Sequence, residues 1–344
     1  MTSSRTLALI QAGGAGSRMD VLTRERAKPA LPFAGVYRLI DFSLSNLTHC
    51  RIDDVWLSVQ FQGSTLEEGV ANGRPWDLDR TRGGLRIMMP EQGTGSLDEE
   101  GFATGNADEL YRIRDKIAVL GPDVVLVMSA DHVYRFDYRD LLETHRRNGA
   151  ECTLLTVEVD VGDASDHAVV TADDQGAVTG FDYKPDDPDH GVVAAEVIAY
   201  DPDVLREVVE ELHRELGPDS DAGDSGLGDF GEHLIPRLIS RGRTYAHHHD
   251  GYWRDLGQPH LYLRAHQDLL TEDHDVLDVP GWPILTVQPQ RRPARLLAGS
   301  TVEDSLVSPG CVIAGSVVRS IIGPGVMVEA GALVRDSVVF ADTV

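Results

Sequence analysis

The chain has 344 residues, of which 42% are hydrophobic and 25% charged, a composition typical of a globular protein with more than one domain. Its formal net charge of −25 argues against a nucleic-acid partner and against binding to an anionic membrane surface. No apolar run is long enough to cross a bilayer, and the N-terminus lacks the features of a signal peptide, so we expect a cytoplasmic protein.

From the N-terminus to about residue 160, short β-branched runs alternate with helical patterns, which is typical of βαβ units and a mostly parallel sheet. The predicted strands are Leu7–Ile10, Asp54–Val59, Val124–Met128 and Thr153–Val159. Apolar residues at helical spacing predict the helices Asp108–Leu120, Tyr138–Arg147, Pro202–Leu216 and Gly231–Ser240. Residues 217–228, rich in Gly, Asp and Ser, predict a loop.

The hydrophobic period changes near the C-terminus, beyond the proline-rich stretch Val279–Pro293, which predicts a linker. Aliphatic or aromatic residues then recur every six positions, with one slip of three, at Val307, Ile313, Ile322, Val328, Val334 and Phe340. This hexapeptide period predicts a short left-handed parallel β-helix, whereas an ordinary meander would alternate by two. A solenoid of few coils needs capping or a partner subunit, so we expect a homo-oligomer, a dimer or a tetramer.

A glycine-rich turn, Gln11–Arg18, follows the first predicted strand and lets backbone N–H groups approach a phosphate closely. It is not a dinucleotide fingerprint, which needs glycine at Met19, and it is not a Walker loop, which needs Gly-Lys-Ser/Thr. Arg18 and Lys28 place two cations within reach of one anion. The turn therefore predicts a phosphate site, although tight packing alone is the alternative.

Two acidic residues are candidates for a metal site. Asp131 follows the predicted strand Val124–Met128, at the edge of a parallel sheet where open α/β folds bind ligands. Asp255 lies in the aromatic-flanked segment Tyr252–Gly257. Two carboxylates from distant segments, together with triphosphate oxygens, form a typical magnesium shell, although Asp131 as the cap of the following turn is the alternative.

Eight segments resemble, in order and spacing, the glucose-1-phosphate adenylyltransferase (ADP-glucose pyrophosphorylase) family of sugar-phosphate nucleotidyltransferases. They are Ala12–Arg18, Arg26–Ala30, Ile40–Asn46, Gly105–Asp108, Ala130–Tyr134, Lys184–Pro185, Asp229–Gly231 and Tyr252–Gly257. The resemblance covers essentially the whole chain. It implies an α/β fold with a Rossmann-like nucleotidyltransferase domain over residues 1–266, whose mixed sheet is mostly parallel, then a linker over 267–296 and a left-handed β-helix over 297–344.

The resemblance also implies a reaction in which a nucleoside triphosphate and a sugar 1-phosphate give an NDP-sugar and pyrophosphate, with Mg²⁺ as cofactor. Asp131 and Asp255 would hold the metal, and Arg18 and Lys28 would neutralise the α-phosphate and the departing pyrophosphate. Lys184 would bind the phosphate of the sugar. The residues implied at the nucleotide are Ala12, Gly13, Gly14, Gly16, Gln92, Gly105 and Asn106.

The chain departs from the family pattern around the implied sugar pocket. Tyr183 replaces a glutamate before Lys184, Ala168 replaces a glycine, and Ala194-Ala195-Glu196 replaces Ser-Met-Gly. The pocket implied by the family includes Tyr183, Ala168, Glu196 and Trp253. Since buried polar groups discriminate strongly among hydroxyl patterns, we expect an acceptor other than plain glucose 1-phosphate. The alternative acceptor is a valienol-type cyclitol 1-phosphate, with GTP as donor.

Two further classes of protein compete with this enzyme. A non-catalytic regulatory paralogue would have lost one of the charged site residues, all of which are present: Arg18, Lys28, Asp131, Lys184 and Asp255. Hexapeptide helices also occur in acyltransferases. That function is disfavoured because the predicted β-helix has few coils and no histidine.

Overall fold

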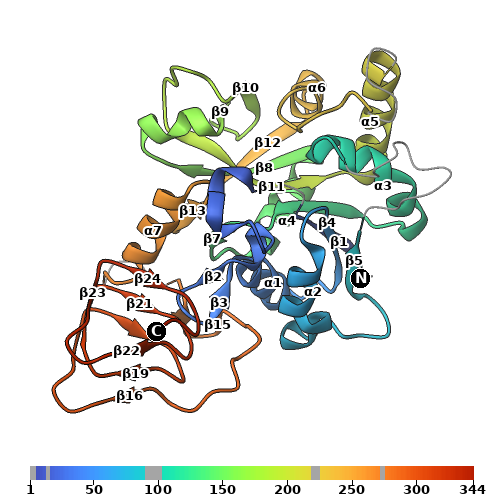
Figure 1. The fold of residues 1–344 in the computed structure, drawn as a ribbon. Coiled ribbons are helices and arrows are strands. Elements are labelled where there is room, and N and C mark those ends of the chain that lie inside the picture. The colour runs from blue at the N-terminus through green and yellow to red at the C-terminus, as the bar shows by residue number, and fades with distance from the viewer. Residues whose placement is uncertain (1–4, 13–15, 90–102, 218–224, 272–275) are drawn as a thin grey trace.

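The computed structural model describes residues 5–12, 16–89, 103–217, 225–271 and 276–344. Figure 1 shows a large α/β domain followed by a β-helix that carries the C-terminus. Within the described residues, no helix is both long enough and apolar enough to cross a membrane. The predicted residues Gly13, Gly14 and Gln92 and most of the loop 217–228 lie outside the described part of the chain.

The α/β domain is built on a nine-stranded sheet in which β10-β9-β11-β6-β1-β4-β5 are neighbours in that order, while β8 pairs with β11 and β12. Its strands are β1 (Thr6–Ala12), β4 (Asp54–Val59), β5 (Gly84–Met88), β6 (Val124–Ser129), β8 (Cys152–Glu158), β9 (Ala168–Ala172), β10 (Val178–Tyr183), β11 (Val192–Tyr200) and β12 (Thr244–His248). Strands β10 and β11 run opposite to the others. The predicted mixed, mostly parallel sheet is therefore confirmed.

Helices cover both faces of this sheet. They are α1 (Leu39–His49), α2 (Gly63–Val70), α3 (Asn106–Leu120), α4 (Tyr138–Arg147), α5 (Pro202–Leu216), α6 (Leu234–Ser240) and α7 (Pro259–Asp268), with short 3-10 turns η1 (Ser17–Leu22), η2 (Lys28–Ala30), η3 (Ala71–Trp76) and η4 (Val161–Asp166). Alternate residues of β1 face opposite sides, so Ala8 and Ile10 pack with α1, α2 and α4, whereas Leu7 and Leu9 pack with α3, α5 and α6.

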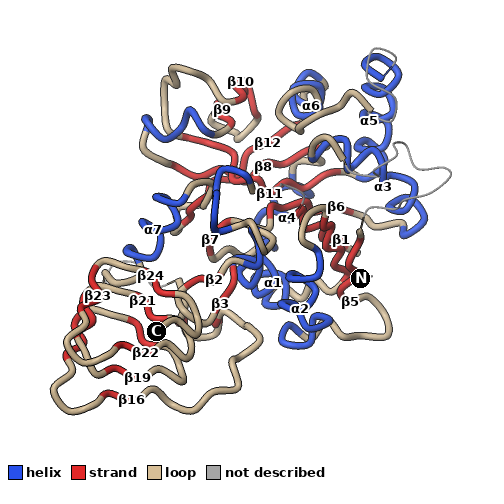
Figure 2. Tube along the Cα trace, in the orientation of Figure 1, coloured by secondary structure: helices blue, strands red, loops and turns tan. Residues whose placement is uncertain are grey.

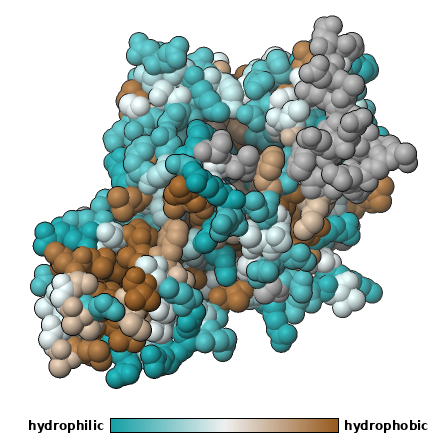
Figure 3. All heavy atoms as spheres, viewed as in Figure 1, coloured by the Kyte–Doolittle hydropathy of each residue, from teal (hydrophilic) through white to brown (hydrophobic). Residues whose placement is uncertain are grey.

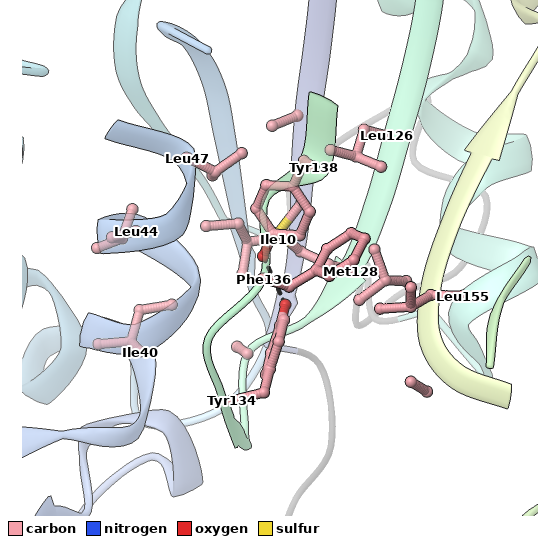
Figure 4. Close-up of a cluster of buried hydrophobic side chains, with 14 of the residues drawn as sticks. Ile10, Ile40, Leu44, Leu47, Leu126, Met128, Tyr134, Phe136, Tyr138 and Leu155 are labelled. Atoms are coloured by element: carbon pink, nitrogen blue, oxygen red, sulfur yellow. Dashed lines mark hydrogen bonds between the residues drawn. The ribbon is translucent and has the colours of Figure 1, made fainter. Parts of the chain in front are cut away.

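The first of these two cores surrounds α1. Figure 4 shows Ile40, Leu44 and Leu47 of α1 directed toward the side chains of the sheet. The hydroxyls of Tyr134 and Tyr138 lie 2.5 Å apart in the same cluster and satisfy each other as hydrogen-bond partners. Helix α1 was not predicted, because every residue from 39 to 47 is buried and the helix has no polar face to mark its period.

The β-helix contains nine short strands in three parallel three-stranded sheets (Figure 2). They are β16 (Arg295–Leu296), β17 (Thr301–Glu303), β18 (Leu306–Val307), β19 (Val312–Ile313), β20 (Ser316–Val318), β21 (Ile321–Ile322), β22 (Met327–Val328), β23 (Leu333–Arg335) and β24 (Val338–Val339). The predicted inward residues Ile313, Ile322 and Val328 are buried in its core. Parallel stacking confirms the predicted β-helix.

One residue of the hexapeptide series was assigned wrongly. Ile322 pairs with Val339, so Val339 rather than Phe340 takes the inward position of its coil. Phe340 points the other way and packs against Tyr262 of α7, with ring centroids 6.4 Å apart. The six-residue step fails on this side of the coil because Val334 and Val339 are five positions apart, as are their partners Val317 and Ile322 in the preceding coil.

The linker is part of the packed structure. Its hairpin β14 (Asp278–Val279) and β15 (Trp282–Pro283) lies against α1, where the Trp282 indole donates a hydrogen bond of 2.9 Å to Asn46 Oδ1. Two pairs of short strands complete the fold: β2 (Pro32–Phe33) with β3 (Tyr37–Arg38), and β7 (His132–Tyr134) with β13 (Trp253–Asp255).

Candidate active site

Two short strands bring the predicted metal ligands together. Strand β7 follows β6 after Asp131 and pairs antiparallel with β13, in a register that places Asp255 opposite His132. Asp131 and Asp255 are therefore neighbours in space although 124 positions separate them in sequence. The pairing explains why Asp131, which follows β6, and Asp255, which ends β13, form one site.

Lys28 joins both carboxylates. It begins η2, and its Nζ lies 2.5 Å from Asp131 Oδ2 and 3.6 Å from Asp255 Oδ1. Burial by itself raises the pKa of Asp131, but its neighbours, chiefly the Lys28 ammonium together with the Ser129 hydroxyl, outweigh it and hold this pKa well below its usual range. Conversely, burial lowers the pKa of Lys28, and the two aspartates together more than offset that effect. Both groups are therefore charged at neutral pH.

A third side chain, which the sequence did not single out as a site residue, faces the same carboxylates. His132 is 3% exposed, and its Nε2 lies 3.7 Å from Oδ1 of Asp131 and 3.7 Å from Oδ1 of Asp255. Its only signal in the sequence was its position in the segment Ala130–Tyr134. Donor atoms of these three residues all lie within 4.8 Å of one another, and the described residues contain no other such group of three. Their chemistry fits a divalent metal ion.

A cavity of about 470 Å³ opens beside these residues at the carboxyl edge of the sheet. The predicted site residues that line it come from both halves of the domain: Arg18, Gly105, Asn106, Asp131, Tyr183, Lys184 and Glu196. The structure therefore brings nucleotide candidates and sugar candidates to one cavity, with the acidic pair and Lys28 at its edge.

At the nucleotide end, backbone packing determines the shape of the wall. A Cβ on Gly105 would lie 2.2 Å from the carbonyl oxygen of Gly228, so only glycine allows this approach. The side chain of Asn106 accepts a hydrogen bond of 2.5 Å from Phe230 N, which fixes the start of α3 against the neighbouring segment. Gly16 has φ of 64°, in the left-handed region that favours glycine.

Two residues of this wall were missed by the sequence analysis. Gln11, the penultimate residue of β1, donates to the Asn106 carbonyl at 2.9 Å and to Glu109 Oε2 at 3.2 Å. Glu109 is 4% exposed, and burial raises its pKa to about 7. A glutamate in the first turn of a helix is common and gives no sign in the sequence that it is buried, because only tertiary contacts bury it.

At the sugar end, two of the departures from the family pattern, Tyr183 and Glu196, line the cavity. The Tyr183 hydroxyl donates to Asp229 Oδ2 at 3.1 Å, and Lys184 Nζ lies 4.7 Å from the centroid of the Tyr183 ring. Glu196 has φ of 52° at an irregularity in the pairing of β11 with β8. Burial raises the pKa of Glu196 above its usual value.

Besides Lys28 and Asp255, four predicted site residues within the described part of the chain do not line this cavity: Ala12, Gly16, Ala168 and Trp253. Ala12 is buried in the core at the end of β1, and Ala168 is buried in β9 where it pairs with Tyr183. Trp253 is 7% exposed and packs edge-on against His132 at 5.0 Å and against His167 at 5.4 Å. Ala168 and Trp253 therefore support other site residues: Ala168 pairs with Tyr183, and Trp253 packs against His132.

Comparisons with known proteins agree with this arrangement. A family model described as nucleotidyl transferase matches residues 7–272, and one described as GlmU-like, C-terminal hexapeptide matches residues 293–344. A glucose-1-phosphate adenylyltransferase from Acetivibrio thermocellus is 33% identical over 100% of this chain and 79% of its own length. Another, from Clostridium perfringens, is 34% identical over 100% of this chain and 86% of its own length. The chain therefore belongs to the nucleotidyl transferase family, and within it to the family of the glucose-1-phosphate adenylyltransferases.

Proposed function

We propose that this enzyme condenses a nucleoside triphosphate with a sugar 1-phosphate, or a close mimic of one, and releases pyrophosphate. The observation that carries the proposal is the convergence of Lys28, Asp131 and Asp255 at the edge of a cavity that Arg18 and Lys184 also line. In a protein with a net charge of −25, such a concentration of cations around two acids suits a phosphate-rich ligand. A non-catalytic paralogue would have no reason to keep this set together.

The chemistry needs position and charge rather than a covalent intermediate. An oxygen of the sugar phosphate forms a bond to the α-phosphorus, and the bond from that phosphorus to the pyrophosphate breaks. Lys184 would hold the attacking phosphate, while Arg18 and Lys28 offset the negative charge that develops on the leaving group. Transfers of this kind depend mainly on alignment and electrostatic stabilisation.

The cofactor that we propose is Mg²⁺, held by Asp131 and Asp255, where it would supply positive charge beside the triphosphate. The nucleotide would lie along the β1 end of the cavity, against Gly16, Gly105 and Asn106. Ala12 lies in the core at the end of β1, just before the glycine-rich turn. Gly13, Gly14 and Gln92 remain predicted contacts of the nucleotide.

The direct test is a pyrophosphate-release assay that crosses ATP, GTP, UTP and dTTP with a panel of sugar 1-phosphates in the presence of Mg²⁺. We expect at least one pair to react at a rate that Asp131→Asn lowers by about 100-fold or more, because the variant removes a charge at the reacting phosphates. Absence of pyrophosphate release with every pair would contradict the proposal.

A second candidate concerns the acceptor. The sugar end of the cavity carries Glu196 and the hydrogen-bonded pair Tyr183–Asp229, and the side chain of Tyr183 fills space beside Lys184. These groups favour an acceptor whose hydroxyl pattern differs from glucose, such as a valienol-type cyclitol 1-phosphate, and GTP is the donor that we predict for that acceptor. Adding that phosphate to the same assay tests the idea, which fails if ATP with glucose 1-phosphate gives the highest kcat/KM.

We also propose that the protein forms a homo-oligomer through its β-helix. Five large apolar side chains of this region are exposed: Leu296, Leu297, Met327, Leu333 and Val344. Figure 3 shows hydrophobic residues gathered over the β-helix, in contrast to the largely hydrophilic surface of the catalytic domain. Light scattering should give a mass of two or four chains, and Leu333→Glu should lower that mass. A monomer at all concentrations would contradict the proposal.

A further inference from the structure

The orientation of His132 has a consequence for the metal site. Its Nδ1 lies 3.2 Å from the carbonyl oxygen of Ala195, which can only accept, so Nδ1 donates the proton. In the neutral ring, Nε2 then carries a lone pair. The edge-on packing of Trp253 at 5.0 Å keeps the imidazole in this orientation. His132 is thus arranged as metal-binding histidines commonly are, with one nitrogen fixed by a backbone carbonyl.

The lone pair of Nε2 faces two carboxylate oxygens, Asp131 Oδ1 and Asp255 Oδ1, at 3.7 Å each. Three electron-rich atoms in this arrangement repel one another unless a cation lies between them. Ligand atoms bound to one ion at about 2.1 Å are roughly 3 to 4 Å apart, and the donor atoms here lie within 4.8 Å of one another. The spacing therefore matches a shared ion.

Lys28 does not occupy this position. It contacts the other oxygen of Asp131, Oδ2, at 2.5 Å, and its distance of 3.6 Å to Asp255 Oδ1 is too long for a hydrogen bond. Asp131 can therefore bind Lys28 through one oxygen and an ion through the other. The Ser129 hydroxyl, which donates to Asp131 Oδ1, holds that carboxylate in place.

We propose that His132 Nε2 is a third protein ligand of the divalent ion, so that two carboxylates and one imidazole hold it in a preformed site. The proposal rests on the function proposed above and identifies its metal preference. Imidazole nitrogen favours transition metals over Mg²⁺, which prefers oxygen alone. The free enzyme should therefore bind Mn²⁺ and Co²⁺ more tightly than Mg²⁺, although availability can still make Mg²⁺ the ion used in a cell.

The test is pulsed electron paramagnetic resonance on the nucleotide-free full chain with one equivalent of Mn²⁺. We expect nitrogen hyperfine coupling from a directly bound imidazole, and displacement of Mn²⁺ only at a Mg²⁺ concentration at least tenfold higher. His132→Gln should abolish the coupling and weaken Mn²⁺ binding by about tenfold or more. The matched control is His167→Gln, which removes the other imidazole against Trp253 and should leave coupling and affinity unchanged.

Bound Mn²⁺ without nitrogen coupling in the wild-type protein would overturn the proposal, and so would failure of the free chain to bind Mn²⁺. The first outcome would make His132 a protonated partner of the two carboxylates instead of a ligand. This measurement on the wild-type protein needs no variant to fold. The measurement is also separate from catalysis. Nitrogen coupling without pyrophosphate release would refute only the proposed function. Pyrophosphate release without nitrogen coupling would refute only the proposal that His132 is a metal ligand.

Discussion

Lys28 places a positive charge directly against Asp131 and Asp255, and its side chain is only 12% exposed. Lys28→Met would leave Asp131, Asp255 and Glu196 without this counter-ion. We expect kcat to fall by about 100-fold or more, because the ammonium is placed where negative charge develops during transfer. Steady-state kinetics measure the effect.

The control for Lys28 is Arg24→Met, which breaks an exposed pair with Asp20 at 3.0 Å whose side chains are each 69% exposed. Such a pair contributes little, so kcat and stability should stay within about twofold and about 1 kcal/mol of wild type. Equal losses of kcat in the two variants would mean that Lys28 acts only through the net charge of the protein and not through its position.

Asp41 makes the stability of the protein depend on pH. It is fully buried at the start of α1, accepts a hydrogen bond of 2.9 Å from Arg38 N, and burial raises its pKa to about 7. The folded chain binds this proton more tightly than the unfolded chain, whose ordinary aspartate pKa is about 3.9. The stability that Asp41 contributes is therefore present at low pH and is lost as pH rises toward 7.

Asp41→Asn removes this titration and leaves the others in place. The free energy of unfolding of wild type minus that of the variant should fall by about 1 kcal/mol per pH unit between pH 5 and pH 7 and level off above pH 7. Urea denaturation at four pH values measures it. A difference that does not change with pH would show that the carboxyl is ionised throughout.

At the scale of elements, the turn before α6 supports the sugar end of the cavity. A Cβ on Gly231 would lie 2.1 Å from the Tyr183 ring, whose hydroxyl is bonded to Asp229. Gly231→Ala should therefore displace Tyr183 and raise the KM for the sugar phosphate several-fold, with a smaller effect on the KM for the nucleotide. Substrate titrations separate the two constants.

Gly162→Ala is the matched control for Gly231, because no atom lies within 4 Å of the position its Cβ would take. It should leave both constants unchanged. If Gly231→Ala changes neither KM, Tyr183 moves without consequence and does not contribute to binding of the acceptor.

The elements also differ in how well the sequence predicted them. The helices α3, α4 and α5 have one buried face and one exposed face, and their predicted bounds agree with the structure to within two residues. The β7–β13 pair is three residues long in each strand and has no period that sequence can reveal. Local patterning therefore predicted the helices around the site but not the pair of strands that positions the two aspartates.

At the scale of the whole molecule, Phe340 connects the β-helix to the catalytic domain. Its ring packs against Tyr262, and the Arg26 guanidinium carbon lies 5.6 Å from the ring centroid. Phe340→Ala should destabilise the protein by about 2 kcal/mol, less than the loss typical of a fully buried phenylalanine. Calorimetry should show the β-helix unfolding at a lower temperature than the catalytic domain.

The control for Phe340 is Val344→Ala, since Val344 is 82% exposed and its truncation should leave the transition unchanged. One cooperative transition at the wild-type temperature in Phe340→Ala would contradict the role of Phe340 in connecting the β-helix to the catalytic domain.

The sequence by itself determined the class of fold, the order of the catalytic domain and the β-helix, and which charged residues are candidates for the site. These depend on periodicity and on residue type, both of which are readable over a few neighbouring positions. The structure brings Arg18, Asp131 and Lys184 to one cavity: Arg18 and Asp131 follow the carboxyl ends of the parallel strands β1 and β6, whereas Lys184 follows β10, which runs the opposite way.

Only the tertiary structure decided which side chains touch one another. The approach of His132 to Asp255, the burial of Glu109 and the packing of Phe340 on Tyr262 each depend on segments that meet across the fold. Desolvation and metal geometry arise from such distant contacts. A residue's environment is therefore a property of the packed molecule, even where its identity and its role follow from the chain.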